Sequence, residues 1–147
     1  MEPSVLMQFK DLGVAAAISL AAAGSALGTG AAGMAAVGAW KKCYAQNKVA
    51  PFMLVVFVGA PLSQTIYGMI LMNKIAEAAA KGQFYLWVGI LGGLAMGLSA
   101  WMQGKTGAGA SDALAETGKG FTNYLIALGI IETVALFVMV FLLGKVV

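Results

Sequence analysis

The chain contains four long stretches without a single Lys or Arg, and they constrain its fold more than any other feature. The stretches are Leu12–Trp40, Val49–Asn73, Gly82–Gly104 and Gly120–Gly144, of 29, 25, 23 and 25 residues. A helix needs about 20 predominantly apolar residues to cross the hydrocarbon core of a bilayer. Each stretch is long enough, so the sequence predicts an all-α membrane protein with four transmembrane helices.

The charge content supports this prediction and narrows the function. Only 10% of the residues are charged and 61% are hydrophobic, whereas a soluble domain carries about 25% charged residues. Glu132 lies near the centre of the fourth stretch, and every other charged residue lies outside the four stretches. A water-soluble enzyme is therefore excluded. Single Lys residues beside the span ends act as interfacial anchors and do not indicate nucleic-acid binding.

The expected connections between the spans are short, so the chain has no room for a second domain. They are Lys41–Lys48, Lys74–Lys81 and Lys105–Lys119. The first stretch begins after Lys10 like a secretory signal, but it is longer than the 7–15 residues of a signal core, so we expect it to remain as a helix.

The two halves of the chain resemble each other, which predicts two tandem duplicated hairpins. The segment from Ser25 to Gly30 precedes a run of small residues, as the segment from Ser99 to Gly104 does 74 residues later. We expect residues 1–76 to form a first hairpin without a carboxylate in its spans. Residues 77–147 then form a second hairpin, which contains Glu132.

Small residues recur four apart in the first and third spans, and bulky residues fill the second and fourth. The small residues are Gly24, Gly28, Ala32 and Ala36 in the first span, and Gly89, Gly93 and Gly97 in the third. Such stripes let helix backbones approach closely in lipid. Helices with small side chains on the inside and helices with bulky side chains on the outside suit packing around a narrow central axis. We therefore expect copies of this chain to assemble into a ring.

Two glycine-containing segments resemble nucleotide-binding motifs without their context. Residues 28–33 fit GxGxxG, but an apolar helix surrounds them and no acid follows about 20 residues later. Residues 99–106 nearly fit the sequence of a phosphate-binding loop, but Ser99 replaces the first glycine. The residues that follow it are not those of a flexible loop that surrounds phosphate groups. Neither segment predicts a nucleotide site.

Glu132 is the one acidic residue inside the four stretches. A carboxylate at the centre of a transmembrane helix costs about 3 kcal/mol to insert on translocon-derived scales. Intramembrane acids therefore mark ion or proton pathways by default. A protonated glutamate that bonds a neighbouring helix is the structural alternative.

Further polar groups are predicted at the depth of Glu132. When two residues face each other across a helical hairpin, the mean of their two residue numbers falls in the turn that joins the helices. Gln103 and Glu132 satisfy this rule for a turn at 116–118, and Thr29 and Gln64 satisfy it for a turn at 46–47. Both polar pairs can therefore lie level in the membrane.

The second span adds ligand atoms near Gln64. Ser63, Gln64 and Tyr67 share one helix face, because residues three and four apart are neighbours on a helix. Pro61 lacks an N–H and can free a carbonyl toward a cavity.

Together these groups predict an all-oxygen site with one negative charge. A carboxylate, a hydroxyl, two amide oxygens and a carbonyl are ligands for a hard cation, and one charge suits a monovalent ion. A carrier of H⁺ needs only the acid in a dry pocket, so the additional oxygens favour Na⁺ over H⁺. Cys43 is the one cysteine and the chain has no His, so a Cys/His metal site is excluded.

At these residues the chain resembles the duplicated-hairpin proteolipid that forms the rotor ring of V-type ATPases, in its bacterial sodium-translocating form. The resemblance rests on Pro61–Gly68, Gln103–Lys105 and Ile131–Thr133. It implies that the metal site consists of Ser63, Gln64, Gln103, Glu132 and the backbone carbonyl of Ala60, with Tyr67 bonded to the carboxylate of Glu132. Gln64 holds in the first half the place that Glu132 holds in the second, so the repeat has lost one acid.

The resemblance also implies the setting of the protein. Many copies form a homo-oligomeric ring in lipid, turned by ATP hydrolysis in a separate sector, so the chain is not catalytic by itself. A stator membrane subunit supplies an Arg, which this chain lacks, and central-stalk subunits face the Lys41–Lys48 and Lys105–Lys119 loops. The expected location is the plasma or inner membrane of a bacterium, as a multi-pass protein.

Three alternatives remain at this stage. The same ring could carry H⁺ on Glu132, with no metal. A small multidrug/proton antiporter also uses one membrane glutamate, although it gives no reason for a duplicated glycine-rich hairpin. A purely structural four-span protein leaves Glu132 without a role.

Overall fold

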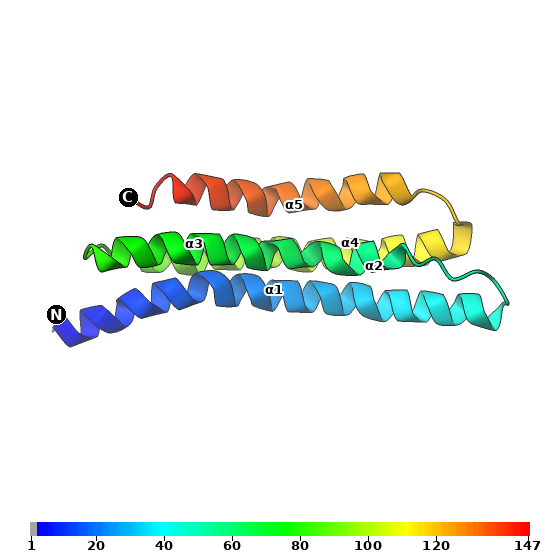
Figure 1. The fold of residues 1–147 in the computed structure, drawn as a ribbon, viewed down its shortest axis with the longest axis horizontal. Coiled ribbons are helices and arrows are strands. Elements are labelled where there is room, and N and C mark those ends of the chain that lie inside the picture. The colour runs from blue at the N-terminus through cyan, green and yellow to red at the C-terminus, as the bar shows by residue number, and fades with distance from the viewer. Residues whose placement is uncertain (1–2) are drawn as a thin grey trace.

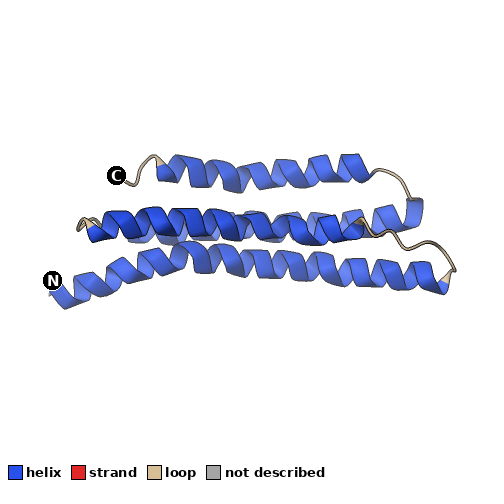
Figure 2. Cartoon of the chain, in the orientation of Figure 1, coloured by secondary structure: helices blue, strands red, loops and turns tan. Residues whose placement is uncertain are grey.

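The computed structural model describes residues 3–147, and the secondary structure of that part of the chain is helical, without strands (Figure 2). The elements are α1 (Pro3–Ala45), α2 (Leu54–Gly59), the 3₁₀ segment η1 (Ala60–Leu62), α3 (Ser63–Ala80), α4 (Leu86–Thr117) and α5 (Phe121–Leu143). Because α2, η1 and α3 follow one another directly, they form one continuous rod. Four segments are long and apolar enough to cross a membrane: Leu12–Ala45, Leu54–Ala80, Leu86–Thr117 and Phe121–Leu143. The predicted all-α architecture with four spans is confirmed.

The four rods run side by side along the longest axis of the molecule, each reversing the direction of the one before (Figure 1). The connections 46–53 and 118–120 lie at one end, and the connection 81–85 lies at the other end with both ends of the described chain. Because α3 continues to Ala80, the first helical hairpin extends beyond the boundary at residue 76 that we expected.

The helices of the first three spans are longer than the stretches without Lys or Arg, which corrects two of the expected connections. Most of Lys74–Lys81 belongs to α3, and most of Lys105–Lys119 belongs to α4. Charged residues mark where a helix leaves the hydrocarbon, and its backbone hydrogen bonds can continue into water. The end of α4 is set instead by Gly118, whose φ of 66° is the left-handed conformation that favours glycine at a helix C-terminus.

Glycines bring α1 and α4 into backbone contact. A Cβ atom at Gly24 would overlap the backbone of Gly97, and one at Gly104 would overlap the backbone of Gly28. Because lipid tails are as apolar as side chains, helix association in a membrane relies on such close van der Waals packing. The close approach predicted from the small-residue stripes is therefore present, between the first and third spans.

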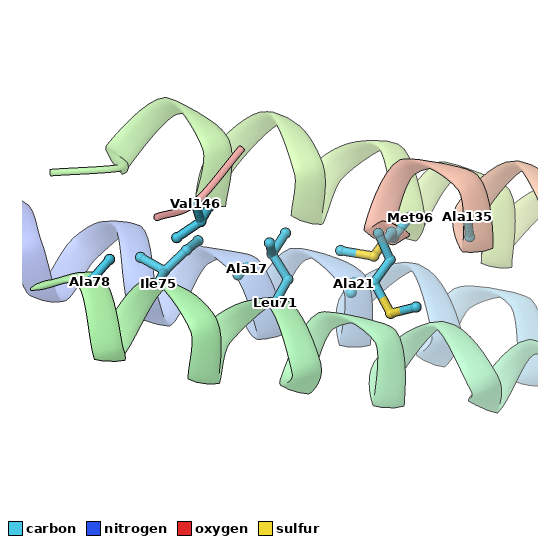
Figure 3. Close-up of a cluster of buried hydrophobic side chains, with 9 residues drawn as sticks. Ala17, Ala21, Leu71, Ile75, Ala78, Met96, Ala135 and Val146 are labelled. Carbon is cyan, nitrogen blue, oxygen red and sulfur yellow. The ribbon is translucent and has the colours of Figure 1, made fainter. Parts of the chain in front are cut away.

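The core consists of two apolar clusters along the bundle. One lies toward the end with the chain termini and is shown in Figure 3: Ala17, Ala21, Leu71, Ile75, Ala78, Met96, Ala135, Met139 and Val146. The other lies toward the opposite end: Ala36, Ala39, Leu54, Phe57, Ala110, Leu114 and Leu128. Gln64 on α3, Gln103 on α4 and Glu132 on α5 each lie, along their own rod, between the members of the two clusters. The two clusters therefore enclose the polar level from both sides.

Pro61 shapes the backbone at that level. It is buried in η1, and it cannot donate the N–H that would ordinarily bond to the carbonyl of Phe57. That carbonyl points at α4, where a Cβ atom at Gly107 would lie only 2.8 Å from the Phe57 oxygen. The proline-induced change in the helix therefore requires a small residue on the neighbouring helix.

We predict that Gly24→Ala destabilises the bundle, because the added methyl group collides with the backbone of Gly97 and overpacking costs about 1–3 kcal/mol. Unfolding in a denaturing detergent measures the loss. Gly30→Ala is the matched control on the same helix, because nothing lies within 4 Å of a Cβ atom there. Equal stability of the two variants would contradict the packing described for α1 and α4.

Candidate ion-binding site

Glu132 lies at the middle of α5 and its side chain is half-buried. The hydroxyl group of Tyr67 donates a hydrogen bond of 2.8 Å to Oε1 of the carboxylate. Nε2 of Gln103 donates one of 3.2 Å to Oε2. Both carboxylate oxygens therefore accept hydrogen bonds, one from α3 and one from α4.

Gln103 connects Glu132 to the rest of the site. Its side chain is fully buried, with an exposed fraction of 0%. Besides Glu132, its Nε2 donates to the backbone carbonyl of Leu128 at 3.0 Å. Its Oε1 accepts a hydrogen bond of 2.8 Å from Nε2 of Gln64, which is also fully buried. The amide of Gln103 therefore joins α4 to both α5 and α3.

The beginning of α3 contributes three oxygen atoms close together. The hydroxyl oxygen of Ser63 lies 3.2 Å from the carbonyl oxygen of Ala60 and 3.2 Å from Oε1 of Gln64. These are a backbone, a hydroxyl and an amide oxygen, all of the hard kind that alkali and alkaline-earth cations prefer. Because Ala60 belongs to η1, the 3₁₀ segment places a carbonyl group beside the two side chains that follow it.

All six residues expected at the site thus belong to one connected polar network. It runs from Ala60 through Ser63, Gln64, Gln103 and Glu132 to Tyr67.

Thr29 does not join this network, although it lies near the level of Gln64 that the sequence predicted. Its hydroxyl group donates to the carbonyl of Ser25 in its own helix, at 2.8 Å. The depth itself is close, because a Cβ atom at the adjacent Gly28 would lie 3.0 Å from the Pro61 side chain. The residue-number rule gives a level along the helix but not the direction of a side chain around it.

A cavity of about 440 Å³ lies next to the carboxyl group of Glu132. Its lining consists of Val56, Ala60, Gln103, Leu125, Leu128, Gly129 and Glu132. Most of the wall is apolar, and electrostatic interactions are stronger in such surroundings than in water. A single negative charge among buried oxygens, beside a space of this size, can hold one small cation or one proton.

Ser99 is a polar contact of α5 that we did not expect from the sequence. Its hydroxyl group donates a hydrogen bond of 2.8 Å to the carbonyl of Ile131, directly before Glu132. One signal was available, because Ser99 precedes Gln103 by four residues and therefore shares its helix face.

Residues 28–33 and 99–106 lie inside α1 and α4, not in loops, in agreement with their exclusion as nucleotide motifs.

Residues 86–143, which comprise α4, its following turn and α5, match the family model of the ATP synthase C subunit. No curated protein matches the chain significantly. The matched segment is less than half of the chain and includes Gln103 and Glu132. Proteins of this family are non-catalytic, ion-carrying subunits that form homo-oligomeric rings in the membrane. The second hairpin is therefore similar to this family, and the first hairpin lies outside the match.

We predict that Tyr67→Phe destabilises the protein by about 1 kcal/mol, the scale of an interhelical hydrogen bond in a membrane, because the carboxyl group of Glu132 loses one donor. Equilibrium unfolding in mixed detergent measures this loss. Tyr44→Phe is the control, since the Tyr44 side chain is 68% exposed. The assignment of Tyr67 to the network fails if the two variants unfold alike.

Proposed function

From the match of the second hairpin to the ATP synthase C subunit, we propose that this chain is the rotor-ring subunit of a V-type ATPase and that it carries Na⁺. The observation that carries the proposal is the connected set of oxygen atoms around Glu132, to which both hairpins contribute. A ring protein that moves only protons would not need the hydroxyl and amide groups that the first hairpin adds.

The V-type assignment is supported by the duplicated hairpin with a single membrane acid. The matched segment supplies the acid on α5, and the first hairpin presents Gln64 in the corresponding place. A protein of four spans therefore carries one negative charge at its site.

The Na⁺ assignment is supported by the number and type of ligand atoms. The proposed ligands are Glu132, Gln103, Gln64, Ser63 and the backbone carbonyl of Ala60. One carboxylate and four neutral oxygens balance the charge of a monovalent ion and replace much of its hydration shell. The hydroxyl of Tyr67 donates to the carboxylate and so holds it in place.

The proposed mechanism follows from the cost of charge in lipid. Na⁺ neutralises Glu132, so a loaded site can turn past lipid without exposing a bare carboxylate. At the stator, an Arg of a different protein competes for Glu132 and releases the ion into an aqueous path, because this chain has no Arg. ATP hydrolysis in a separate sector turns the ring, through stalk proteins that contact the connections 46–53 and 118–120. We place the protein in the cell membrane of a bacterium.

We predict that Glu132→Gln abolishes ion transport, because the amide has no charge to balance a cation, while a folded ring still forms. Transport into vesicles and particle size in detergent are the two measurements. Glu77→Gln is the control, since that carboxylate is exposed and pairs only at 3.9 Å with Lys74. Normal transport by Glu132→Gln would refute the assignment, and particles no larger than a dimer would refute the ring.

We predict that Na⁺ protects Glu132 from labelling by a lipid-soluble carbodiimide, because a bound cation occupies the carboxylate. Ser63→Ala should raise the Na⁺ concentration for half-protection by roughly 10-fold, the lower range for loss of a group at a metal site. Ser63→Thr retains the hydroxyl and should stay near the original value. Absence of protection at any Na⁺ concentration would mean that the ring carries H⁺.

A further inference from the structure

Two hydrogen bonds from side chains of α4 reach the backbone of α5 beside the candidate carrier. Ser99 donates to the carbonyl of Ile131 at 2.8 Å, and Gln103 donates to the carbonyl of Leu128 at 3.0 Å. The two donors are one turn apart on α4, and the two acceptors are nearly one turn apart on α5. Ser99 is buried, with an exposed fraction of 7%. The two helices are therefore joined at two successive turns.

Few buried apolar side chains of α5 define its rotation about its own axis. Leu128, Ala135 and Met139 are its buried residues, and most of its remaining side chains are exposed or half-buried. The helix is apolar on nearly all sides, with the highest mean hydropathy of the four spans, 2.7. Lipid does not distinguish one apolar face of a helix from another, so directional hydrogen bonds have to select the face that turns inward.

We propose that Ser99 is a positioning residue, which fixes the rotation of α5 so that the side chain of Glu132 points toward Tyr67 and Gln103. The accepting carbonyl belongs to the residue directly before Glu132, so the bond acts on the backbone that carries the carboxylate. Each residue of an α-helix turns the chain by about 100°. A modest rotation would therefore move the carboxyl group away from both donors.

The first hairpin provides an internal comparison. Ser25 occupies the position 74 residues before Ser99 and is also buried, with an exposed fraction of 2%. Within the described part of the chain, however, its hydroxyl group has no hydrogen-bond partner. The interhelical bond is thus not a general result of the repeat. It occurs in the hairpin that carries the carboxylate.

The test compares three single variants. Ser99→Ala removes the hydroxyl, and Ser99→Thr retains it. Ser111→Ala is the matched control, because Ser111 is a fully buried serine of the same helix whose hydroxyl donates to its own helix, at Gly107, over 2.9 Å. None of the three changes a proposed ligand atom.

The first measurement rests on the proposed function, because it uses protection of Glu132 by Na⁺ against carbodiimide labelling. We expect Ser99→Ala to raise the Na⁺ concentration for half-protection about 10-fold, the lower range for loss of a supporting contact at a metal site. Ser99→Thr should restore the original value, and Ser111→Ala should keep it.

The second measurement reports the rotation of α5 without Na⁺. Gly92 of α4 lies against Leu142 of α5, since a Cβ atom at Gly92 would be 2.6 Å from the Leu142 side chain. The pair Gly92→Cys and Leu142→Cys, with Cys43→Ser, should form a disulfide on oxidation. Adding Ser99→Ala should reduce its yield several-fold.

The outcomes separate the two proposals. If Na⁺ gives no protection even in the unaltered protein, the Na⁺ assignment fails, and the cross-linking yield alone decides the role of Ser99. The role of Ser99 is refuted if Ser99→Ala leaves the yield unchanged, if Ser111→Ala has the same effect, or if Ser99→Thr does not restore it. Loss of the folded ring in Ser99→Ala would also refute it, because the bond would then hold the hairpin together instead of orienting α5.

Discussion

The placement of one carboxyl group in hydrocarbon is the constraint on which the rest of this structure depends. Glu132 has to find hydrogen-bond donors at the centre of a span, where water is absent and an uncompensated charge costs about 3 kcal/mol even on lenient scales. Tyr67 and Gln103 supply those donors from two different helices. The orientation of the Gln103 side chain is fixed in turn by a further hydrogen bond, which Nε2 of Gln64 donates to Oε1 of Gln103. Three helices are therefore held at one level by polar contacts, although their outer surfaces are apolar.

The glycine contacts between α1 and α4 determine where those polar groups can be. Because Gly24 and Gly28 lie against the backbone of α4, one face of α4 is fully occupied by α1. The adjacent face, with Ser99, Gln103 and Gly107, is turned toward the rod of α2, η1 and α3 and toward α5. Gly107 also leaves the space into which the carbonyl of Phe57 points, so the break at Pro61 and the position of Gln103 are parts of one packing arrangement.

The features that the sequence predicted well are those that depend on local pattern. Span number follows from the lengths of the uncharged stretches, and the level of Gln103 follows from its distance to the turn. The direction of a side chain around a helix is not contained in such counts. Thr29 lies near the predicted level but bonds within its own helix. The spacing of Ser99 from Gln103 places the two on one helix face, but it does not specify the backbone carbonyl to which Ser99 donates. The predicted positions of the helix ends were also wrong. Charged residues mark where a helix leaves the hydrocarbon, and the hydrogen-bonded backbone of the helix can continue beyond that point.

The presence of an amide at Gln64, and not of a second acid, suits so compact a network. Two carboxylates at the places of Gln64 and Glu132 would be joined through the single side chain of Gln103, and like charges at such separations repel strongly in surroundings of low dielectric constant. With an amide at Gln64, repulsion is replaced by a hydrogen bond of 2.8 Å to Gln103. The proposed site then keeps one negative charge, which one monovalent cation neutralises. In the proposed function a neutral loaded site can face lipid, and one acid among four spans then corresponds to one ion.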